Sequence, residues 1–136
     1  MKLRFSIPAF VIVASMLLGC DSGPAPAAGG TSGTLKFGDA VTSDIVITVH
    51  RANGASLEVV GFGTTQPDGS FVLYKPGAGE PLFLEPGSYS CTLESVGPPL
   101  KLPKEYLEAS RSPLKIEWTA DLKSLDLTAP AKILSP

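Results

Sequence analysis

The sequence predicts an all-β domain, a sandwich or barrel of about seven strands, on three observations. Short apolar runs are separated by Gly, Pro, Asp or Asn at intervals of roughly eight to twelve residues, the spacing of strands and turns in all-β folds. Within the runs, apolar and polar residues alternate with a period of two, as on a strand with one buried face. No stretch keeps a helical period for three turns.

The predicted strands occupy the chain from Gly33 onward. The clearest alternation lies in residues 45–50, where three aliphatic residues share one face and Thr48 and His50 share the other. Seven runs are predicted as strands: Thr34–Phe37, Ile45–Arg51, Leu57–Phe62, Ser70–Tyr74, Gly87–Ser95, Leu114–Trp118 and Ser124–Leu127.

The clearest turn signal lies in residues 64–71. Pro67 presets φ for the start of a tight turn, and Gly69 can adopt the positive φ that closes it. Phe71 follows at once in an apolar run, so we expect a hairpin between the third and fourth strands. Residues 105–109 predict a single short helical turn.

The first 19 residues are typical of a secretory signal peptide. Lys2 and Arg4 give a positive start, and the run from Phe5 to Leu18 is apolar apart from two serines. That run is shorter than the roughly 20 residues that cross a bilayer, and Pro8 interrupts it. A removable signal is therefore favoured over a permanent membrane span.

The end of this segment, Leu17-Leu18-Gly19-Cys20, resembles the lipobox of bacterial lipoproteins. The resemblance implies cleavage after Gly19 and lipid, including palmitate-type acyl chains, on Cys20. Each buried methylene adds about 0.8 kcal/mol of membrane affinity, so two chains anchor stably. An ordinary signal peptide with a chance cysteine is the alternative. In enteric bacteria an aspartate at the position of Asp21 retains lipoproteins in the inner membrane, but this sorting code does not transfer reliably to other phyla. The choice between inner and outer membrane therefore stays open.

Residues 20–32 are predicted to be a tether. After the cysteine this stretch has no large apolar residue, so nothing offsets the entropy of ordering it. We expect it to hold the domain clear of the lipid headgroups. Residues 33–136 then form the β-sandwich domain, whose roughly 100 residues are enough for one compact core.

Charge excludes some partners. Removal of Lys2 and Arg4 with the signal leaves nine basic residues against 13 acidic ones, a net charge of about −4. Such a domain lacks the basic surface that binds nucleic acid. It also lacks a polybasic patch that would assist membrane binding. We therefore expect the membrane to be reached through the lipid alone.

Cys91 is predicted to be a core side chain without a disulfide. Once Cys20 carries lipid, Cys91 has no cysteine left to pair with. It shares a strand face with Tyr89 and Leu93, and cysteine is among the most buried residue types. A reactive thiol is the alternative.

Four motifs follow one another along the chain. They are the strand opening at Gly33, the turn in residues 64–71, Pro86-Gly87-Ser88-Tyr89, and the segment Leu102–Glu117. Together they resemble the carboxypeptidase regulatory-like (transthyretin-like) domains found as small lipoproteins, notably in Planctomycetes. The chain departs from that pattern at Gln66-Pro67, where an acidic residue is usual, and in its first hairpin. The resemblance implies a seven-stranded Greek-key sandwich and an accessory or binding module with no established catalytic role. A fold alone does not supply a function.

Candidate catalytic residues are few. A hydrolase would need His50, the single histidine, as a base beside a nucleophile and an orienting acid. No Gly-x-Ser-x-Gly elbow is present. We expect His50 to be a surface side chain on the outer strand face, where it could pair with a carboxylate. Glu105 and Glu108 lie in a predicted loop, where solvation explains them better than a glycosidase pair.

No metal or cofactor is expected. Asp68 before Gly69 superficially resembles part of a calcium loop, but the D-x-D-x-D-G array is absent, and aspartate before glycine is a common turn former. One histidine and one buried cysteine do not make up a zinc site.

The segment from Gly97 to Pro113 is long for a compact domain, and long loops are often functional. Tyr106 and Arg111 are its candidate surface-recognition residues, since exposed aromatic and arginine side chains suit contacts. The alternative is that its apolar residues only cover the end of the sandwich.

Together these features predict a lipid-anchored, non-catalytic binding or scaffold module of the cell envelope, facing the periplasm or the exterior. An envelope protein or polysaccharide is the expected partner besides the membrane. Two alternatives stay open: a subunit of an envelope or secretion machine with a transthyretin-like fold, and a small hydrolase that uses His50.

Overall fold

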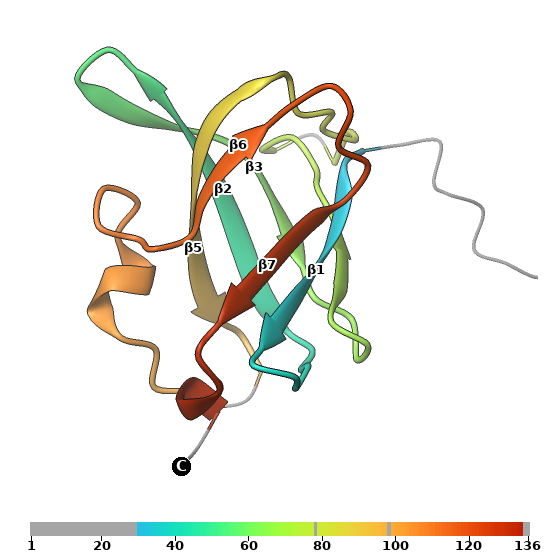
Figure 1. Ribbon diagram of the computed structural model, residues 1–136, viewed down its shortest axis with the longest axis vertical. Helices are drawn as coiled ribbons and strands as arrows, with labels where there is room; N and C mark the ends of the chain where they lie inside the picture. Colours follow the sequence, from blue (N-terminus) through green and yellow to red (C-terminus); the bar gives the residue numbers. More distant parts are fainter. Residues whose placement is uncertain (1–29, 78, 98, 135–136) are drawn as a thin grey trace, which may run out of the picture.

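The computed structural model describes residues 30–77, 79–97 and 99–134. The predicted signal, Gly19 and Cys20 lie outside these residues. All seven predicted strands are present in the described chain (Figure 1). They are β1 (Ser32–Phe37), β2 (Ile45–Asn53), β3 (Ser56–Thr64), β4 (Ser70–Val72), β5 (Gly87–Ser95), β6 (Lys115–Trp118) and β7 (Leu125–Ala129).

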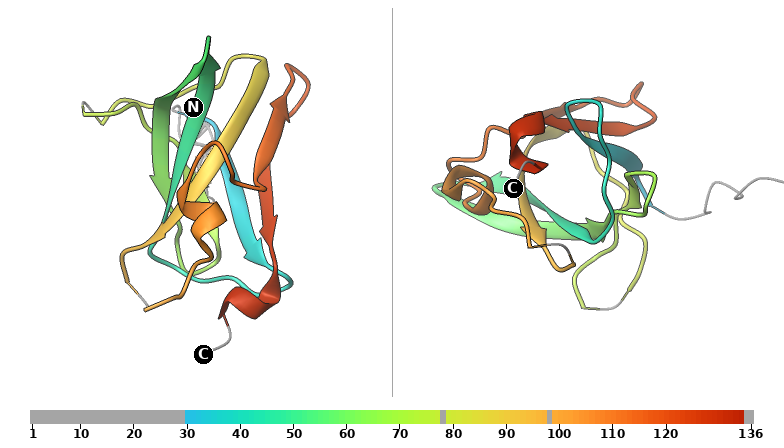
Figure 2. Two further views of the ribbon diagram at one scale, coloured as in Figure 1. Left: turned by 90° about the vertical axis from the view of Figure 1, so that its left-hand side faces the viewer. Right: turned by 90° about the horizontal axis from the view of Figure 1, so that it is seen from below.

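The strands form two sheets that face each other across one core, so the all-β sandwich is confirmed (Figure 2). The larger sheet has the order β3-β2-β5-β6, and the smaller has the order β4-β1-β7. β5 returns to lie beside β2, with β3 on the other side of β2 and β4 reached from β3, which is a Greek-key arrangement. β1 and β7 pair in parallel, while the other strand pairs are antiparallel.

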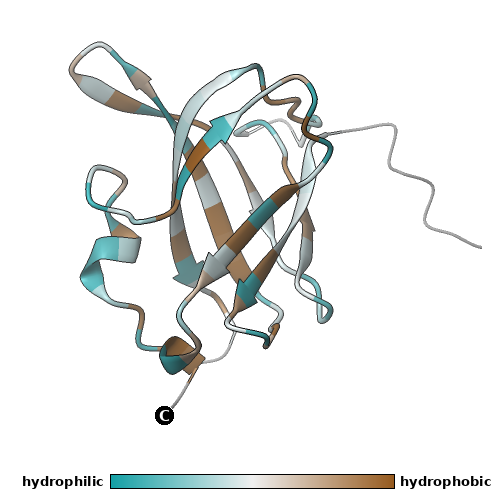
Figure 3. Cartoon of the chain, in the orientation of Figure 1, coloured by the Kyte–Doolittle hydropathy of each residue, from teal (hydrophilic) through white to brown (hydrophobic). Residues whose placement is uncertain are grey.

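The core follows the alternation of the strands. β7 buries every second residue, and its hydropathy alternates along the strand (Figure 3). β2 does the same from Ile45 to Val49. The most deeply buried large side chains are Phe37, Phe71, Leu35, Ile45, Ile47, Leu73, Leu93, Val49 and Cys91. Burial of these groups is the main stabilising term of a domain of this size.

The predicted turn forms, but the hairpin is only partly right. The Gly69 N–H donates to Gln66 O at 2.8 Å and Gly69 has φ +81°. However, β3 belongs to the larger sheet whereas β4 pairs with β1 in the smaller one, so the turn carries the chain between sheets. Across the turn Gln66 N donates to Ser70 O at 2.8 Å, and farther along the arms an isolated bridge pairs Phe62 with Tyr74. Sequence alternation defines strands, but it does not say which sheet each strand enters.

The predicted tether is too long at its carboxyl end. Thr31 is buried and donates its N–H to Leu82 O at 2.7 Å, and its carbonyl accepts from Leu73 N at 2.9 Å. Its hydroxyl accepts from Leu84 N at 2.9 Å. Thr31 and Ser32 therefore belong to the domain and not to the tether. The reason is that hydrogen bonds, and not apolar burial, hold this segment in place.

The two ends of the sandwich differ, and we name them by their residues. The amino-terminal end comprises Gly30, Thr31 and residues 51–55, 73–77, 79–87 and 119–124; the far end comprises residues 38–44, 65–69, 96–97 and 131–134. A 3-10 helix, η2 (Ala131–Leu134), buries Ile133 at the far end. No helix within the described residues is long and apolar enough to cross a membrane.

Candidate functional site

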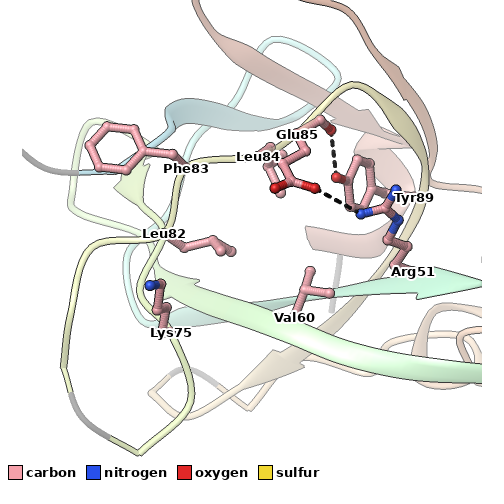
Figure 4. A pocket seen from close by; sticks show the side chains of 8 residues that line it. All are labelled: Arg51, Val60, Lys75, Leu82, Phe83, Leu84, Glu85 and Tyr89. Atoms are coloured by element: carbon pink, nitrogen blue, oxygen red, sulfur yellow. Dashed lines mark hydrogen bonds and ion pairs between the residues drawn. The ribbon is translucent and has the colours of Figure 1, made fainter.

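A cavity of about 310 Å³ opens at the amino-terminal end, where the two sheets no longer cover each other (Figure 4). β4 ends at Val72, so the inner face of the larger sheet is covered here only by the segment that leads into β5. The volume is at the lower limit of small-molecule sites. Its lining residues are Arg51, Val60, Lys75, Leu82, Phe83, Leu84, Glu85 and Tyr89.

Arg51 lies in the cavity because β2 continues its alternation past the core. Ile45, Ile47 and Val49 face inward, so Arg51 is the next inward position, and it lies directly opposite Tyr89 on β5. Its guanidinium carbon lies 5.8 Å from the centre of the Tyr89 ring, which is cation–π geometry. The inward-facing row of β2 thus ends in the charged Arg51, at the level where the smaller sheet ends.

Glu85 connects the polar groups of the cavity. One of its carboxylate oxygens accepts from Arg51 Nη1 at 3.3 Å, and its backbone carbonyl accepts from the Tyr89 hydroxyl at 2.5 Å. The Arg51 side chain is 45% exposed and that of Glu85 is 79% exposed. Exposed ion pairs contribute only about 0–1 kcal/mol, so this pair can open at little cost.

The apolar wall of the cavity is fixed by close backbone packing. Leu82 and Leu84 are both bonded to Thr31, which holds this segment against the sandwich. Gly61 on β3 allows the segment to approach, since a Cβ there would lie 2.6 Å from Tyr74 O and would also meet the Leu82 side chain. Any larger residue at position 61 would force the wall outward.

The residues that line the cavity offer apolar contacts and hydrogen bonds to a small molecule. They comprise apolar side chains, two cations, one carboxylate and one phenol, and none is a serine, cysteine or histidine. The mixture offers both donors and acceptors beside an apolar wall.

His50 lies on the outer face of the larger sheet, as its alternation predicts. It is half-buried, and its Nε2 lies 3.1 Å from Thr92 Oγ1. Partial burial lowers the pKa of the imidazole. Within the described residues no carboxylate lies within 4.0 Å of the ring, so the arrangement has no orienting acid for a triad.

Cys91 is fully buried and is a free thiol in the described chain, which confirms its predicted place in the core. Burial raises the pKa of the thiol to about 12. Because the thiolate is the reactive form, Cys91 is inert at neutral pH.

Of the two residues predicted for surface recognition, Arg111 is exposed and Tyr106 is not. Tyr106 lies in a 3-10 helix, η1 (Lys104–Leu107), and is only 4% exposed, so its ring fills the side of the core and is not a surface contact. The amphipathic ring is buried because η1 packs against β5. Burial, and then the charge of Glu105, raise the pKa of its hydroxyl. Arg111 is exposed and pairs with Glu108 at 3.5 Å.

Asp68 acts as a turn former. Its Oδ1 accepts from Ser70 N at 3.0 Å and from Ser70 Oγ at 2.6 Å. The hydrogen bonds from Ser70 lower the pKa of this exposed carboxyl. In the part of the chain that the structure describes, no group of three or more His, Cys, Asp or Glu side chains could hold a metal ion.

Sequence reasoning does not predict the cavity. Its residues come from β2, β3, β5 and an irregular segment, and only the sheet topology brings them together. One signal is present in the sequence: Arg51 continues the inward period of Ile45, Ile47 and Val49, and a charge on a buried face indicates a site or an edge of the core.

Comparison with protein-family models, with curated proteins and with solved structures finds no match to the chain. The function is therefore inferred from the chain's own residues.

Proposed function

We propose that this chain is a lipid-anchored, non-catalytic binding module of the cell envelope, and that its ligand occupies the Arg51–Tyr89 cavity. The observation that supports binding most is the cavity itself. It combines an apolar wall with exposed donors and acceptors at an end of the core that packing leaves open. The lipobox-like Leu17-Leu18-Gly19-Cys20 supports the anchor.

The rim of the cavity favours a neutral ligand. Arg51 pairs with Glu85 at 3.3 Å and Lys75 pairs with Glu80 at 3.8 Å, so each cation has an acid beside it. A ligand with hydroxyl or amide groups can exchange hydrogen bonds with both members of such a pair without leaving a charge unpaired. The volume fits one sugar unit, which agrees with an envelope polysaccharide as partner.

The experiment is a titration of the lipidated, ¹⁵N-labelled protein in detergent micelles with N-acetylglucosamine, followed by NMR. We expect shift changes at Arg51, Glu85 and Tyr89 at millimolar concentrations. N-acetylmuramic acid, which adds a carboxylate, should bind no more tightly, because both cations of the rim are already paired with glutamates. Arg51→Gln should reduce the affinity at least about fivefold, the loss of roughly one hydrogen bond.

Arg111→Gln is the matched control, since Arg111 is also an exposed arginine paired with a glutamate but lies outside the cavity. It should bind as the parent does. Shift changes spread over the surface, or equal losses in both variants, would refute the cavity as the binding site.

A further inference from the structure

The most exposed aromatic side chain of the described residues lies beside the point where the tether joins the domain. Phe83 is 63% exposed. Its neighbours Leu82 and Leu84 are both hydrogen-bonded to Thr31, so Phe83 lies next to the first residues of the described chain. An exposed phenylalanine costs solubility unless something apolar covers it.

A second exposed apolar residue lies at the same end. β1 and β7 run in parallel with Gly33 opposite Leu125, so the loop before β7 lies at the end where β1 begins. Leu122 is in that loop and is 41% exposed. Figure 1 shows this loop, between β6 and β7, at the end of the domain where β1 begins.

The predicted anchor lies a short distance along the chain from this end. Gly30 follows Cys20 by ten residues. At most about 3.6 Å per residue, they span no more than roughly 36 Å. A domain of about 100 residues has a radius of gyration of about 13 Å, which for a sphere is a diameter of roughly 34 Å. The far end reaches the lipid only when this stretch is fully extended, whereas the amino-terminal end reaches it at any extension.

We infer that the amino-terminal end of the domain rests on the membrane surface, with Phe83 and Leu122 in contact with lipid. This inference rests on the proposed anchor at Cys20. The short distance and the exposed Phe83 both argue against the expectation that the tether holds the domain clear of the headgroups.

The contact is apolar and not electrostatic. With Arg51 included, residues 73–87 and 119–124 bring three basic residues against two glutamates and one aspartate, so this end has no excess of positive charge. Lys75 is also paired with Glu80 at 3.8 Å. Attraction to anionic lipid therefore contributes little, and the contact should persist at high salt.

Membrane contact through Phe83 is compatible with the cavity. Figure 4 shows the Phe83 ring on the opposite side of the cavity from Arg51 and Tyr89. The Arg51–Glu85 rim lies at the same end of the domain, across the cavity from Phe83. A ligand near the membrane can thus still reach it.

The test uses lipidated full-length mature protein in vesicles of phosphatidylcholine with brominated acyl chains, which quench nearby tryptophan. Phe83→Trp and Val96→Trp form a matched pair, because Val96 is 61% exposed and follows the last residue of β5, at the far end. Trp118 is the single native tryptophan and is buried, so the parent protein supplies the background.

We expect the emission of Phe83→Trp to fall by half or more relative to vesicles without bromine, at low and at high salt, while Val96→Trp is unchanged. Leu122→Trp gives a second readout at the amino-terminal end and should also be quenched. Equal quenching at both ends, or none in the Phe83→Trp and Leu122→Trp variants, would overturn the orientation. A protein partner that covered Phe83 in place of lipid would give the second result.

Flotation separates this inference from the anchor. Protein that floats with the vesicles but shows no quenching at the amino-terminal end refutes the orientation and leaves the anchor intact. Protein that stays in the soluble fraction although its mature chain begins at Cys20 refutes the anchor and the orientation together.

Discussion

The two ends of the sandwich are built differently. At the far end the strands finish in tight turns, η2 buries Ile133, and Phe37 is completely enclosed. At the amino-terminal end the smaller sheet stops short, Arg51 stands where a core residue would be, and Phe83 is left exposed. The amino-terminal end is therefore the more open of the two, and it carries the groups to which we assign ligand binding and membrane contact.

The difference shows that a small domain can be closely packed in one region and open in another. Side chains that are already packed against one another have no free surface, so a binding site needs an incompletely packed region. In this chain that region lies where the tether joins the domain, and the resulting loss of core must be offset elsewhere. The following changes separate the two ends by their effects on stability and binding.

Truncation of a deeply buried side chain on β5 should lower the stability most. Leu93 is 1% exposed on β5, so Leu93→Ala should lower the free energy of unfolding by about 3–5 kcal/mol. Leu82→Ala should cost only about 1–2 kcal/mol, because Leu82 is partly buried and already faces the cavity. Urea unfolding measures both. Equal losses would mean that the amino-terminal end is packed as well as the rest.

The segment that covers the side of the core depends on one buried hydroxyl. Ser112 Oγ donates to Cys91 O and accepts from Leu114 N at 3.1 Å. Ser112→Ala leaves both backbone groups unsatisfied and should cost about 1–3 kcal/mol, a fall in melting temperature of roughly 4–20 °C. Ser88→Ala, which removes an exposed bond to Glu117, should change stability by less than about 0.5 kcal/mol. A similar small change for Ser112→Ala would contradict the buried bonds.

A change at Arg51, in the cavity, should affect ligand binding more than stability. Its ion pair with Glu85 is exposed, so Arg51→Gln should lower stability by less than about 1 kcal/mol while it weakens ligand binding. Thermal unfolding and the NMR titration measure the two effects on the same protein. A loss of several kcal/mol would show that Arg51 is a structural residue and not a recognition residue.

The smallest effect is the pH dependence of His50. Burial lowers the pKa of His50 in the folded state below its unfolded value of about 6.5. The stability that neutral His50 provides is therefore complete above about pH 6.5 and is lost as the pH falls through the folded pKa. Urea unfolding at pH 7.5 and pH 5 should show a smaller decrease for His50→Gln than for the parent. An identical decrease in both would contradict the shift.

Most of the fold can be predicted from the sequence, because the patterns that define its strands and turns are local. Alternation in residues 45–50, the Pro67–Gly69 turn and the shared face of Tyr89, Cys91 and Leu93 each act over a few residues. All seven strands and the burial of Cys91 are predicted correctly. Local patterns do not show that β3 and β4 lie in different sheets, since strand pairing is decided by long-range packing.

The site could not be predicted from the sequence, because long-range packing brings its residues together. Tyr106 in a long segment reads as a surface aromatic, and only the packing of η1 on β5 shows it to be buried. Arg51 and Glu85 are 34 residues apart and meet only through the Greek-key topology. Thr31 was predicted to be part of the tether, because hydrogen bonds hold it in the domain and a hydrogen bond gives no hydrophobic pattern in the sequence.

We propose that lipid on Cys20 fixes the domain to a membrane, and the mass of the mature protein tests this anchor. Protein extracted from membranes with detergent should begin at Cys20 and carry the added mass of a diacylglycerol on that residue, and Cys20→Ser should abolish the addition. An unmodified protein that begins at another residue, or that is recovered without detergent, would contradict the anchor.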